Sequence, residues 1–524
     1  MQNEENRLLS PPIKSVLIYT FSITVLVFIS SWQSLNFHFW KDDWSRLWMA
    51  YYRPELLLTL LGLPDHPGMT LEQMFFGPIF KLNPLYWQIE GLVLKILASL
   101  SVSLMILGIT KSFKTAALAG LFFSTTVIGI ESFTWASNHA AALIIIFFGI
   151  GFYYWVKSFE ENSLIGFICS LPFLLISIFI SPARATGLPA LIVIWDILSF
   201  IKSPSQKRAK LAILRIITFL FLLLLTFSIL QGKGTGGLVS RSTESIGIIS
   251  GDFIPRISNF FASIGNLSIG WIIPIQEIAG LSSPTFLSLL SCFFLLIFLY
   301  LTAIRFLKLR TNELQWRLFF LLFIPIAYLP NWWFYSYIAA GTSYRYLTIS
   351  SIALAYLVSS FITSVNRKYF LTICLLILGL NIFYTNMLLS SQLPYRSITA
   401  VNNVWNQIDD FVPKGESDDI FVYTGQDTNR LMLLDWSITI PFAIKRNITN
   451  PRDFPMLLYD EESIKKMLCG EEVVVNTLAG QFIHHEKTPL SHLYAWRLDH
   501  GNVINESAKL RDFFASQTKC SLQK

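Results

Sequence analysis

Long apolar runs are the feature of this sequence that most limits what it can fold into. About eleven runs, most of roughly 17 to 23 mainly apolar residues, precede residue 390. A run of this length crosses a bilayer as a helix, because the hydrocarbon core holds no water to pair with exposed backbone groups. The sequence therefore predicts a mainly α-helical, polytopic membrane protein, in which the short third, sixth and ninth runs are compatible with broken or buried helices. The predicted spans are Ile13–Leu35, Trp87–Ile109, Thr115–Ile130, Ala140–Val156, Leu164–Ser181, Gly187–Ile201, Leu211–Leu230, Pro284–Ile304, Leu318–Leu329, Leu347–Thr363 and Tyr369–Leu389.

Composition supports a membrane protein and argues against a nucleic-acid-binding one. Hydrophobic residues make up 53% of the 524 residues and charged residues 14%, whereas a soluble domain has about a quarter charged residues. The formal net charge is +7, but most Lys and Arg residues fall in short loops between apolar runs. Such a distribution indicates membrane topology, and we expect no nucleic-acid partner.

Basic residues are distributed unevenly between the two sets of loops. With the N-terminus in the cytoplasm, the short outer loops hold few cations, chiefly Arg184 and Arg345, and the inner loops hold many. This bias follows the positive-inside rule. It predicts a multi-pass protein of the plasma (inner) membrane, with residues 391–524 on the extracytoplasmic side. The inner-loop cations are Lys111, Lys114, Lys157, Lys202, Lys207, Arg208, Lys210, Arg215, Arg305, Lys308, Arg310, Arg317, Arg367 and Lys368.

A change of composition near residue 390 divides the chain into two predicted domains. Residues 1–390 form a transmembrane domain with long outer loops at 36–86 and 231–283, and residues 391–524 form a small soluble α/β domain. Cys469 and Cys520 are the pair that could form a disulfide in an oxidising compartment. In the soluble domain we expect buried strands at Asp419–Tyr423, Val473–Val475 and Leu493–Leu498 and a helix at Glu461–Leu468, and in the outer loops we expect surface elements at Pro54–Gly62 and Phe253–Ile273.

Two adjacent carboxylates, Asp42 and Asp43, follow the first apolar run and stand among aromatic residues that include Trp40 and Trp44. Aromatic side chains favour the headgroup region, so the acidic pair lies at the membrane surface, where an enzyme acting on a lipid-linked substrate needs its base. The alternative is a solvated pair that only flanks a membrane helix, which is the commoner situation for an isolated pair. Polar residues in the other outer loops bear on this choice.

Each later outer loop contributes polar residues at a helix end. Glu131 and His139 lie between the third and fourth runs, Arg184 follows the fifth, and Tyr344-Arg345-Tyr346 precedes the tenth. A single Arg there commonly extends to lipid headgroups, and a lone His is commonly a structural hydrogen-bonding group. A carboxylate at a membrane boundary costs free energy unless water, a cation or a substrate accompanies it. Because Arg binds phosphate oxygens in pairs, these residues predict a site for a lipid phosphate.

Several of these stretches occur in a characteristic order over the first 350 residues: Asp42-Asp43-Trp44, Tyr52-Arg53-Pro54, Leu82–Trp87, Glu131–Asn138, Ser181–Asp196 and Tyr344–Leu347. In that order they resemble bacterial members of the GT-C glycosyltransferase superfamily, particularly the branch related to protein O-mannosyltransferases. The resemblance implies a GT-C-like membrane domain that uses a polyprenyl-phosphate-linked sugar.

The same resemblance implies a reaction and residue roles. Asp42 or Asp43 would be the base that takes a proton from an acceptor hydroxyl of a protein, lipid or glycan, and transfer would invert the anomeric carbon. The leaving phosphate would be stabilised by Arg345, with Arg53 or Arg184. A divalent metal, Mg²⁺ or Mn²⁺, between the two carboxylates is compatible with this scheme and not required by it. The implied substrate-binding residues are Arg53, Glu131, His139, Arg184, Tyr344, Arg345 and Tyr346.

Departures from the family pattern leave the donor sugar and the acceptor open. Leu63–Met69 interrupts the region after Arg-Pro, and Ser181-Pro182-Ala183-Arg184 stands where relatives often have Ser-Lys-Glu. Two rival functions are a carrier or flippase, and a polymerase or ligase, of lipid-linked glycans. A carrier needs charged residues buried along its helices, and we expect Glu90, Lys95 and Asp196 to lie near helix ends instead.

Overall fold

The computed structural model divides the chain into two compact units. The helical unit comprises Met1–Ser34, Leu60–Leu71 and Gln88–Leu389, and the mixed unit comprises Leu35–Thr59, Glu72–Trp87 and Ser390–Lys524. The mixed unit therefore combines most of the first outer loop with the C-terminal part of the chain. The described residues are 12–62, 67–161, 163–229, 253–270, 286–335, 344–412, 419–425, 439–458, 460–477, 480–499 and 502–517.

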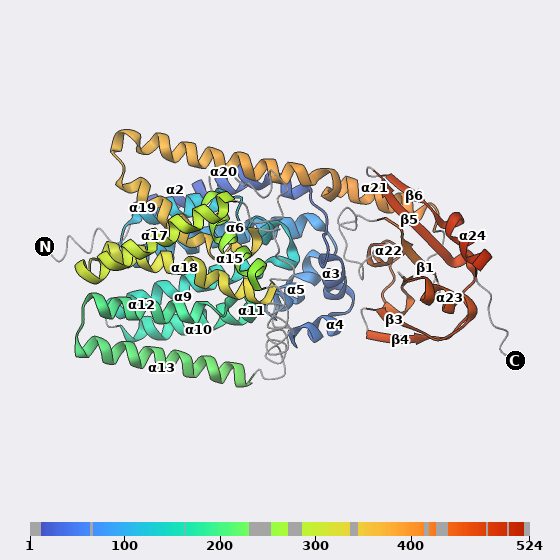
Figure 1. Ribbon diagram of the computed structural model, residues 1–524, viewed down its shortest axis with the longest axis horizontal. Coiled ribbons are helices and arrows are strands. Elements are labelled where there is room, and N and C mark those ends of the chain that lie inside the picture. Colours follow the sequence, from blue (N-terminus) through green and yellow to red (C-terminus); the bar gives the residue numbers. More distant parts are fainter. Residues whose placement is uncertain are drawn as a thin grey trace. The chain divides into compact units, whose positions relative to one another are not determined.

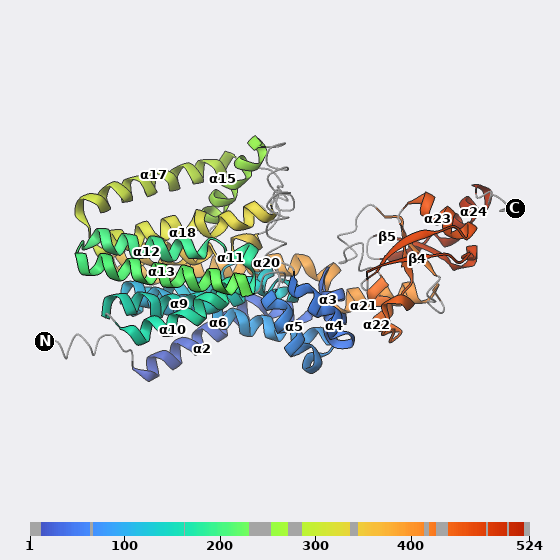
Figure 2. The same cartoon turned by 90° about the horizontal axis from the view of Figure 1, so that it is seen from below.

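Each predicted apolar run contains a helix, and the long helices of the helical unit run side by side (Figures 1 and 2). Eight helical stretches among the described residues are long and apolar enough to cross a membrane. The sixth and ninth runs, expected to be short, belong to the longer stretches Pro182–Lys202 and Asn312–Phe334, whereas the third, fifth and tenth form shorter helices. The helices are α2 (Ile13–Ser31), α6 (Pro84–Thr110), α7 (Phe113–Thr125), α8 (Glu131–Thr134), α9 (Ala140–Glu161), α10 (Leu164–Ile180), α11 (Pro182–Ala185), α12 (Leu188–Lys202), α13 (Gln206–Ile229), α15 (Phe253–Gly270), α17 (Phe286–Leu309), α18 (Asn312–Tyr335), α19 (Ser351–Ser364) and α20 (Arg367–Arg396).

Successive helix ends alternate between two ends of the helical unit. At one end, Lys111 Nζ lies 2.7 Å from a carboxylate oxygen of Glu160, and Lys202 Nζ donates to Asn312 at 2.6 Å. Residues of the predicted inner loops therefore meet at this end. The opposite ends of the same helices carry the predicted substrate-binding residues of this unit.

Three charged residues lie deeper in the helices than the sequence suggested. Lys95, in the interior of α6, is 1% exposed, and its Nζ donates to Ser31 Oγ at 3.0 Å. Asp196 accepts hydrogen bonds from the Trp155 indole N–H at 3.0 Å and from Arg215 Nε at 3.3 Å. The expectation that Lys95 and Asp196 lie near helix ends is therefore wrong. So is the assignment of Arg215 to an inner loop, because α13 begins before this residue and buries it against Asp196.

A four-stranded sheet forms the centre of the C-terminal part of the mixed unit (Figure 1). Its order is β2-β1-β5-β6, with β1 parallel to β2 and β5, and β5 antiparallel to β6; β3 and β4 form a separate antiparallel hairpin. The expected strands and helix are found as β1, β3, β5 and α23. The strands are β1 (Ile420–Tyr423), β2 (Met456–Leu457), β3 (Val473–Thr477), β4 (Gly480–His484), β5 (Leu493–Asp499) and β6 (Asn502–Asn505), and the C-terminal helices are α21 (Ile398–Asp409), α22 (Thr439–Lys445), α23 (Glu461–Cys469) and α24 (Ser507–Gln517).

Helix α23 shows how local sequence fixes an element against this sheet. The carboxylate of Asp460 caps its first turn by accepting the Ser463 N–H at 2.7 Å, and Gly470 ends it in the left-handed conformation, with φ of 74°. Its apolar face packs with β1 and β5 in the core of the domain. Cys469, the last residue of α23, is disulfide-bonded, and Cys520, its expected partner, lies outside the described residues.

The first outer loop is more helical than the sequence predicted. The surface element expected at Pro54–Gly62 is α4 (Pro54–Thr59) followed by a 3-10 turn at Leu60–Gly62. It is flanked by α3 (Asp43–Tyr52) and α5 (Pro67–Phe80), which were not predicted. The acidic pair therefore stands at the start of a helix.

Candidate functional site

Arg345 and Glu131 form the centre of a polar group at the end of the helical unit where α18 is followed by α19. Arg345 belongs to the 3-10 turn Tyr344–Leu347, and Glu131 begins α8. Arg345 Nη1 lies 3.8 Å from Glu131 Oε2, and the two side chains are 12% and 18% exposed. Water and salt screen an ion pair of such low exposure less than a surface pair. The pair can therefore hold both side chains in place at the end of the membrane helices.

Aromatic rings surround the guanidinium group of Arg345. Its central carbon lies 4.7 Å from the centroids of both Trp135 and Tyr346, and its Nη2 donates to the Tyr346 hydroxyl at 2.9 Å. Arg184, from α11, approaches the same Tyr346 ring at 5.7 Å. Two guanidinium groups from separate loops thus meet at one ring. Guanidinium groups held in this way present N–H donors in a geometry that suits phosphate oxygens.

Hydrogen bonds tie the loop after α7 to the turn that carries Arg345. The hydroxyl groups of Ser132 and Thr348 are 2.9 Å apart, and Thr348 Oγ1 donates to the Arg345 carbonyl oxygen at 2.6 Å. Gly129 has φ of 80°, and a Cβ at this position would lie 2.3 Å from Thr348 Oγ1. A side chain at residue 129 would therefore be strained and would also displace this contact.

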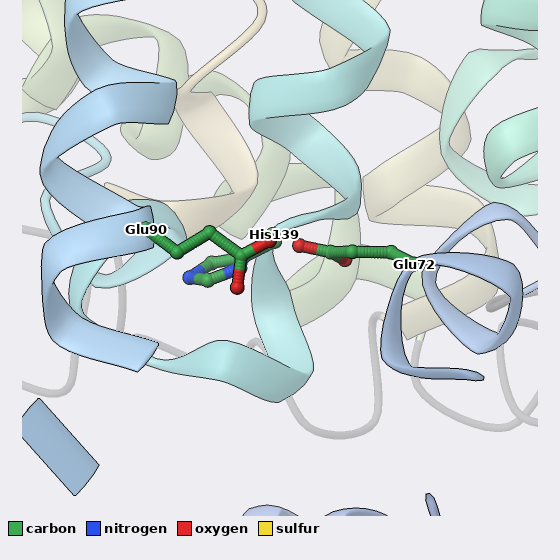
Figure 3. Close-up of side chains that lie close together, drawn as sticks. All are labelled: Glu72, Glu90 and His139. Atoms are coloured by element: carbon green, nitrogen blue, oxygen red, sulfur yellow. The ribbon is translucent and has the colours of Figure 1, made fainter. Parts of the chain in front are cut away.

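Glu90 and His139 bring a carboxylate and an imidazole together in the helical unit. Their potential ligand atoms lie within 4.8 Å of each other, and both residues are buried (Figure 3). Gly91 permits this approach, because a Cβ there would lie 1.8 Å from the Phe133 carbonyl oxygen and 3.4 Å from His139 Nε2. The two side chains could supply two ligands to a divalent metal ion. Glu72, also labelled in Figure 3, belongs to the mixed unit.

Asp42 and Asp43 stand at the start of α3 in the mixed unit. Lys41 precedes them with φ of 50°, and the buried Asp43 carboxylate accepts the Trp40 N–H at 3.0 Å. Asp42 is half-buried, and its carbonyl oxygen accepts the Arg46 N–H at 3.0 Å. A carboxylate at a helix start is favourable because it faces the N–H groups and the positive end of the helix dipole. Asp43 thus helps to form the turn, and Asp42 keeps the more exposed side chain.

A metal between these two carboxylates was compatible with the sequence. Among the described residues, the group of His and acidic side chains close enough to share a metal ion does not include Asp42 or Asp43. Glu90 and His139 are therefore the better candidates for metal ligands.

A stacked pair of rings lies beside the turn that carries Asp42 and Asp43, called the acidic turn below. The imidazole of His38 stacks on Trp44, with 4.7 Å between centroids and 18° between planes, and its Nδ1 accepts the Phe39 N–H at 2.7 Å. Burial lowers the pKa of His38 to about 3. The imidazole is therefore neutral at physiological pH and supplies no positive charge to a phosphate.

Arg53, a predicted phosphate-binding residue, lies at the end of α3. It forms an ion pair with the neighbouring Glu55, and the two side chains are 35% and 56% exposed. An ion pair this exposed contributes little, because water competes for both groups. Arg53 is therefore a weaker candidate for phosphate binding than the more buried Arg184 and Arg345.

Sequence reasoning missed Arg396 in the mixed unit. Arg396 is fully buried at the end of α20, and its guanidinium carbon lies 4.5 Å from the Phe37 ring and 4.3 Å from the Trp40 ring. The predicted last span ends at Leu389, so this residue was assigned to the soluble domain. The sequence could have indicated this contact, because Arg396 is the first cation after that span and aromatic residues stand at the start of the first loop.

Comparisons with known proteins found similarity only among solved structures. No family model matches the chain, and no curated protein matches it. The apo crystal structure of the Archaeoglobus fulgidus oligosaccharyltransferase has a TM-score of 0.45 at 12% identity, over 80% of this chain and 63% of that one. The structure of the same organism's oligosaccharyltransferase AglB with an inhibitory peptide and a dolichol-phosphate has a TM-score of 0.42 at 11% identity, over 84% of this chain and 64% of that one.

A third structure, the Archaeoglobus fulgidus oligosaccharyltransferase tethered to an acceptor peptide, has a TM-score of 0.44 at 13% identity, over 80% of this chain and 62% of that one. This chain thus matches less than two thirds of the length of these enzymes. TM-scores below 0.5 do not establish a common fold. The residues of this chain must therefore carry the functional argument.

Proposed function

We propose that this chain is an integral membrane glycosyltransferase of the GT-C type. It transfers a sugar from a polyprenyl monophosphate donor to an acceptor hydroxyl of a protein, lipid or glycan on the extracytoplasmic side, with inversion at the anomeric carbon. The observation that carries the proposal is the pair of Arg345 and Arg184 at the Tyr346 ring, with Glu131 paired to Arg345, at one end of helices long enough to span a membrane. A phosphate on a membrane-embedded lipid requires cationic donors at this position.

The arginines act on the leaving group. When the bond between the anomeric carbon and the phosphate oxygen breaks, the polyprenyl phosphate gains negative charge. Arg345 and Arg184 stabilise this charge with N–H donors that are already oriented by the Tyr346 ring. Glu131 keeps Arg345 in position, and Tyr346 borders the same substrate site.

The acidic turn acts on the acceptor. Asp42 or Asp43 removes the hydroxyl proton as the acceptor oxygen bonds to the anomeric carbon. A weak base suffices, because a glycosyl transition state is loose and the proton leaves late. The half-buried Asp42 is better suited to this step, and the buried Asp43 is better suited to holding the turn.

Glu90 and His139 fit a divalent metal ion that accepts nitrogen ligands. Imidazole favours transition metals such as Zn²⁺ over Mg²⁺, which prefers oxygen ligands. A bound ion would supply positive charge toward a phosphate. Glu90 provides the anionic ligand and His139 a neutral one, so the site favours a cation.

The disulfide at Cys469 supports the proposed orientation. Disulfides persist in oxidising compartments and are rare in the cytosol. A disulfide in the C-terminal part of the mixed unit therefore agrees with an extracytoplasmic location for this part and a cytoplasmic N-terminus.

A carrier for lipid-linked glycans is the second candidate, and Lys95 is the observation that favours it. A buried Lys within a membrane helix is costly and commonly marks a transport path or a functional site. The Asp196–Arg215 ion pair needs no such explanation, because each charge has a partner. A single buried cation is weaker support than the polar cluster around Arg345.

Separate replacement of the two carboxylates tests the enzyme. Asp42→Asn and Asp43→Asn proteins, purified and supplied with a polyprenyl-phosphate hexose carrying a radioactive sugar, are expected to lose transfer in at least one case. The lipid-linked sugar that accumulates in cells lacking the protein, identified by mass spectrometry, supplies the donor. Full transfer by both variants would refute the assignment, and translocation of the donor across vesicles without sugar transfer would support the carrier.

A further inference from the structure

The first outer loop and the end of α20 are joined within the mixed unit. Phe37 and Ser397 form an isolated antiparallel bridge, and the His38 N–H donates to the Arg396 carbonyl oxygen at 2.8 Å. These backbone bonds join two segments that lie at opposite ends of the sequence. They fix the start of the first loop beside residues 396 and 397.

The side chain of Arg396 continues this junction toward the acidic turn. Its guanidinium group lies over the rings of Phe37 and Trp40, at 4.5 Å and 4.3 Å, and its Nη1 donates to Gln392 Oε1 at 2.9 Å. The Trp40 N–H in turn donates to the Asp43 carboxylate at 3.0 Å. A continuous chain of contacts therefore leads from the end of α20 to Asp43.

A second junction holds the helix that follows the acidic pair. The indole N–H of Trp48 donates to the Ile448 carbonyl oxygen at 3.2 Å, and its ring packs edge-on against Phe454 at 5.0 Å. Trp48 is fully buried. Helix α3 consequently lies beside α22 in both views of the molecule (Figures 1 and 2).

We propose that Arg396 and Trp48 are positioning residues for Asp42 and Asp43, so that the C-terminal part of the chain sets the orientation of the catalytic carboxylates. This inference rests on the proposed function. Arg396 fixes the turn before the acidic pair, and Trp48 fixes the helix after it. The C-terminal part is thereby a component of the catalytic apparatus and more than a module that binds acceptor.

Replacement of Arg396 separates positioning from binding. We expect Arg396→Met to lower kcat by about 100-fold, because a misplacement of about 1 Å can cost that much, while the KM for the polyprenyl-phosphate sugar stays unchanged. Arg396→Lys keeps a cation over the two rings and is expected to recover much of kcat. Arg511→Met is the matched control, because Arg511 also lies over a ring, that of Tyr494, and bonds the Leu493 carbonyl oxygen.

Hydrogen exchange of the backbone gives a readout that needs no activity. Residues 38–47 are expected to exchange faster in Arg396→Met, and in Trp48→Phe, which loses the bond to Ile448 and part of the buried ring, than in the native protein or in Arg511→Met. Unchanged exchange in both variants, or faster exchange with native kcat, would overturn the inference. The two proposals fail separately: full transfer by both Asp→Asn variants rejects the catalytic assignment of these carboxylates, whereas exchange reports on the junction alone.

Discussion

Arg345 has the Glu131 carboxylate on one side, and the rings of Trp135 and Tyr346 lie around its guanidinium group. These contacts depend on the planar shape of the guanidinium. A Lys at this position would keep the charge but lose the forked donors and the stacking on Trp135 and Tyr346. We expect Arg345→Lys to raise the KM for the polyprenyl-phosphate sugar by roughly 10- to 100-fold, in line with the loss of a charged hydrogen bond.

Arg317→Lys serves as the control for this change. Arg317 forms an i,i+4 ion pair with Glu313 at the opposite end of the helical unit, so its replacement is expected to leave the KM unchanged. A native KM for Arg345→Lys in the same assay would show that the donor phosphate binds at another site.

His38 predicts a pH dependence of stability. Its pKa is about 3 in the folded protein and 6.5 ordinarily, because burial disfavours the charged form. Between these values the unfolded chain binds a proton that the folded chain does not. Stability is therefore lost as pH falls from about 6.5 toward 3, by at most about 1.4 kcal/mol per pH unit from this group.

Thermal unfolding of the purified protein between pH 4 and 8 measures this effect. His38→Gln should flatten the dependence below pH 6.5, and His485→Gln, which replaces an exposed histidine, should not. An equal slope in native protein and His38→Gln would contradict the burial argument.

At the residue scale, the sequence was informative where a charge stood at the edge of an apolar run. Glu131, Arg184 and Arg345 were selected as candidates in this way. In the structure Glu131 pairs with Arg345, and both arginines approach the Tyr346 ring. Lys95 and Arg215 were misplaced because a hydropathy reading treats every charge as a loop or a helix end. The partner of Arg215 is Asp196, on a different helix, and only tertiary packing brings them together.

At the element scale, apolar runs long enough to span a membrane predicted the helices well, since length and hydropathy depend on local sequence alone. The hairpin of β3 and β4 was harder. Val473, Val474 and Val475 suggested a fully buried strand, but Val474 is exposed and pairs with the exposed Ile483. A strand presents alternate residues to opposite faces, so three consecutive valines cannot all face one core.

The approach of α6 to the loop after α7 depends on the absence of a side chain at Gly91. A Cβ there would lie 1.8 Å from the Phe133 carbonyl oxygen, so Gly91→Ala forces the backbones apart. We expect a loss of about 1–3 kcal/mol in the free energy of unfolding, seen as a lower Tm, together with reduced transfer because His139 moves.

Gly379→Ala in α20 is the matched control. No atom lies within 4 Å of a Cβ at Gly379, so Ala should be neutral or stabilise by roughly 0.5–1 kcal/mol through helix propensity. Equal Tm values for the two variants would show that α6 can shift without cost.

For the whole molecule, hydropathy shows where the chain leaves the membrane but not which outer segments pack together. The mixed unit is built from Leu35–Thr59, Glu72–Trp87 and Ser390–Lys524, three segments that no local pattern connects. Contacts such as Phe37 with Ser397 depend on the complete fold. The participation of the first loop in this unit could therefore not be predicted from the sequence.

The proposed orientation of the protein in the membrane is based on the distribution of its charges and can be tested directly. Alkaline phosphatase folds only where disulfides form, so a fusion after Lys524 should be active and one after Ser364, at the Lys111 end of the helices, should be inactive. Green fluorescent protein fused at the same positions should give the opposite pattern. Activity of the phosphatase at Ser364 would show that the orientation is the reverse of the one proposed. The Arg345 cluster would then lie on the cytoplasmic side, and the donor would have to be available on the inner leaflet.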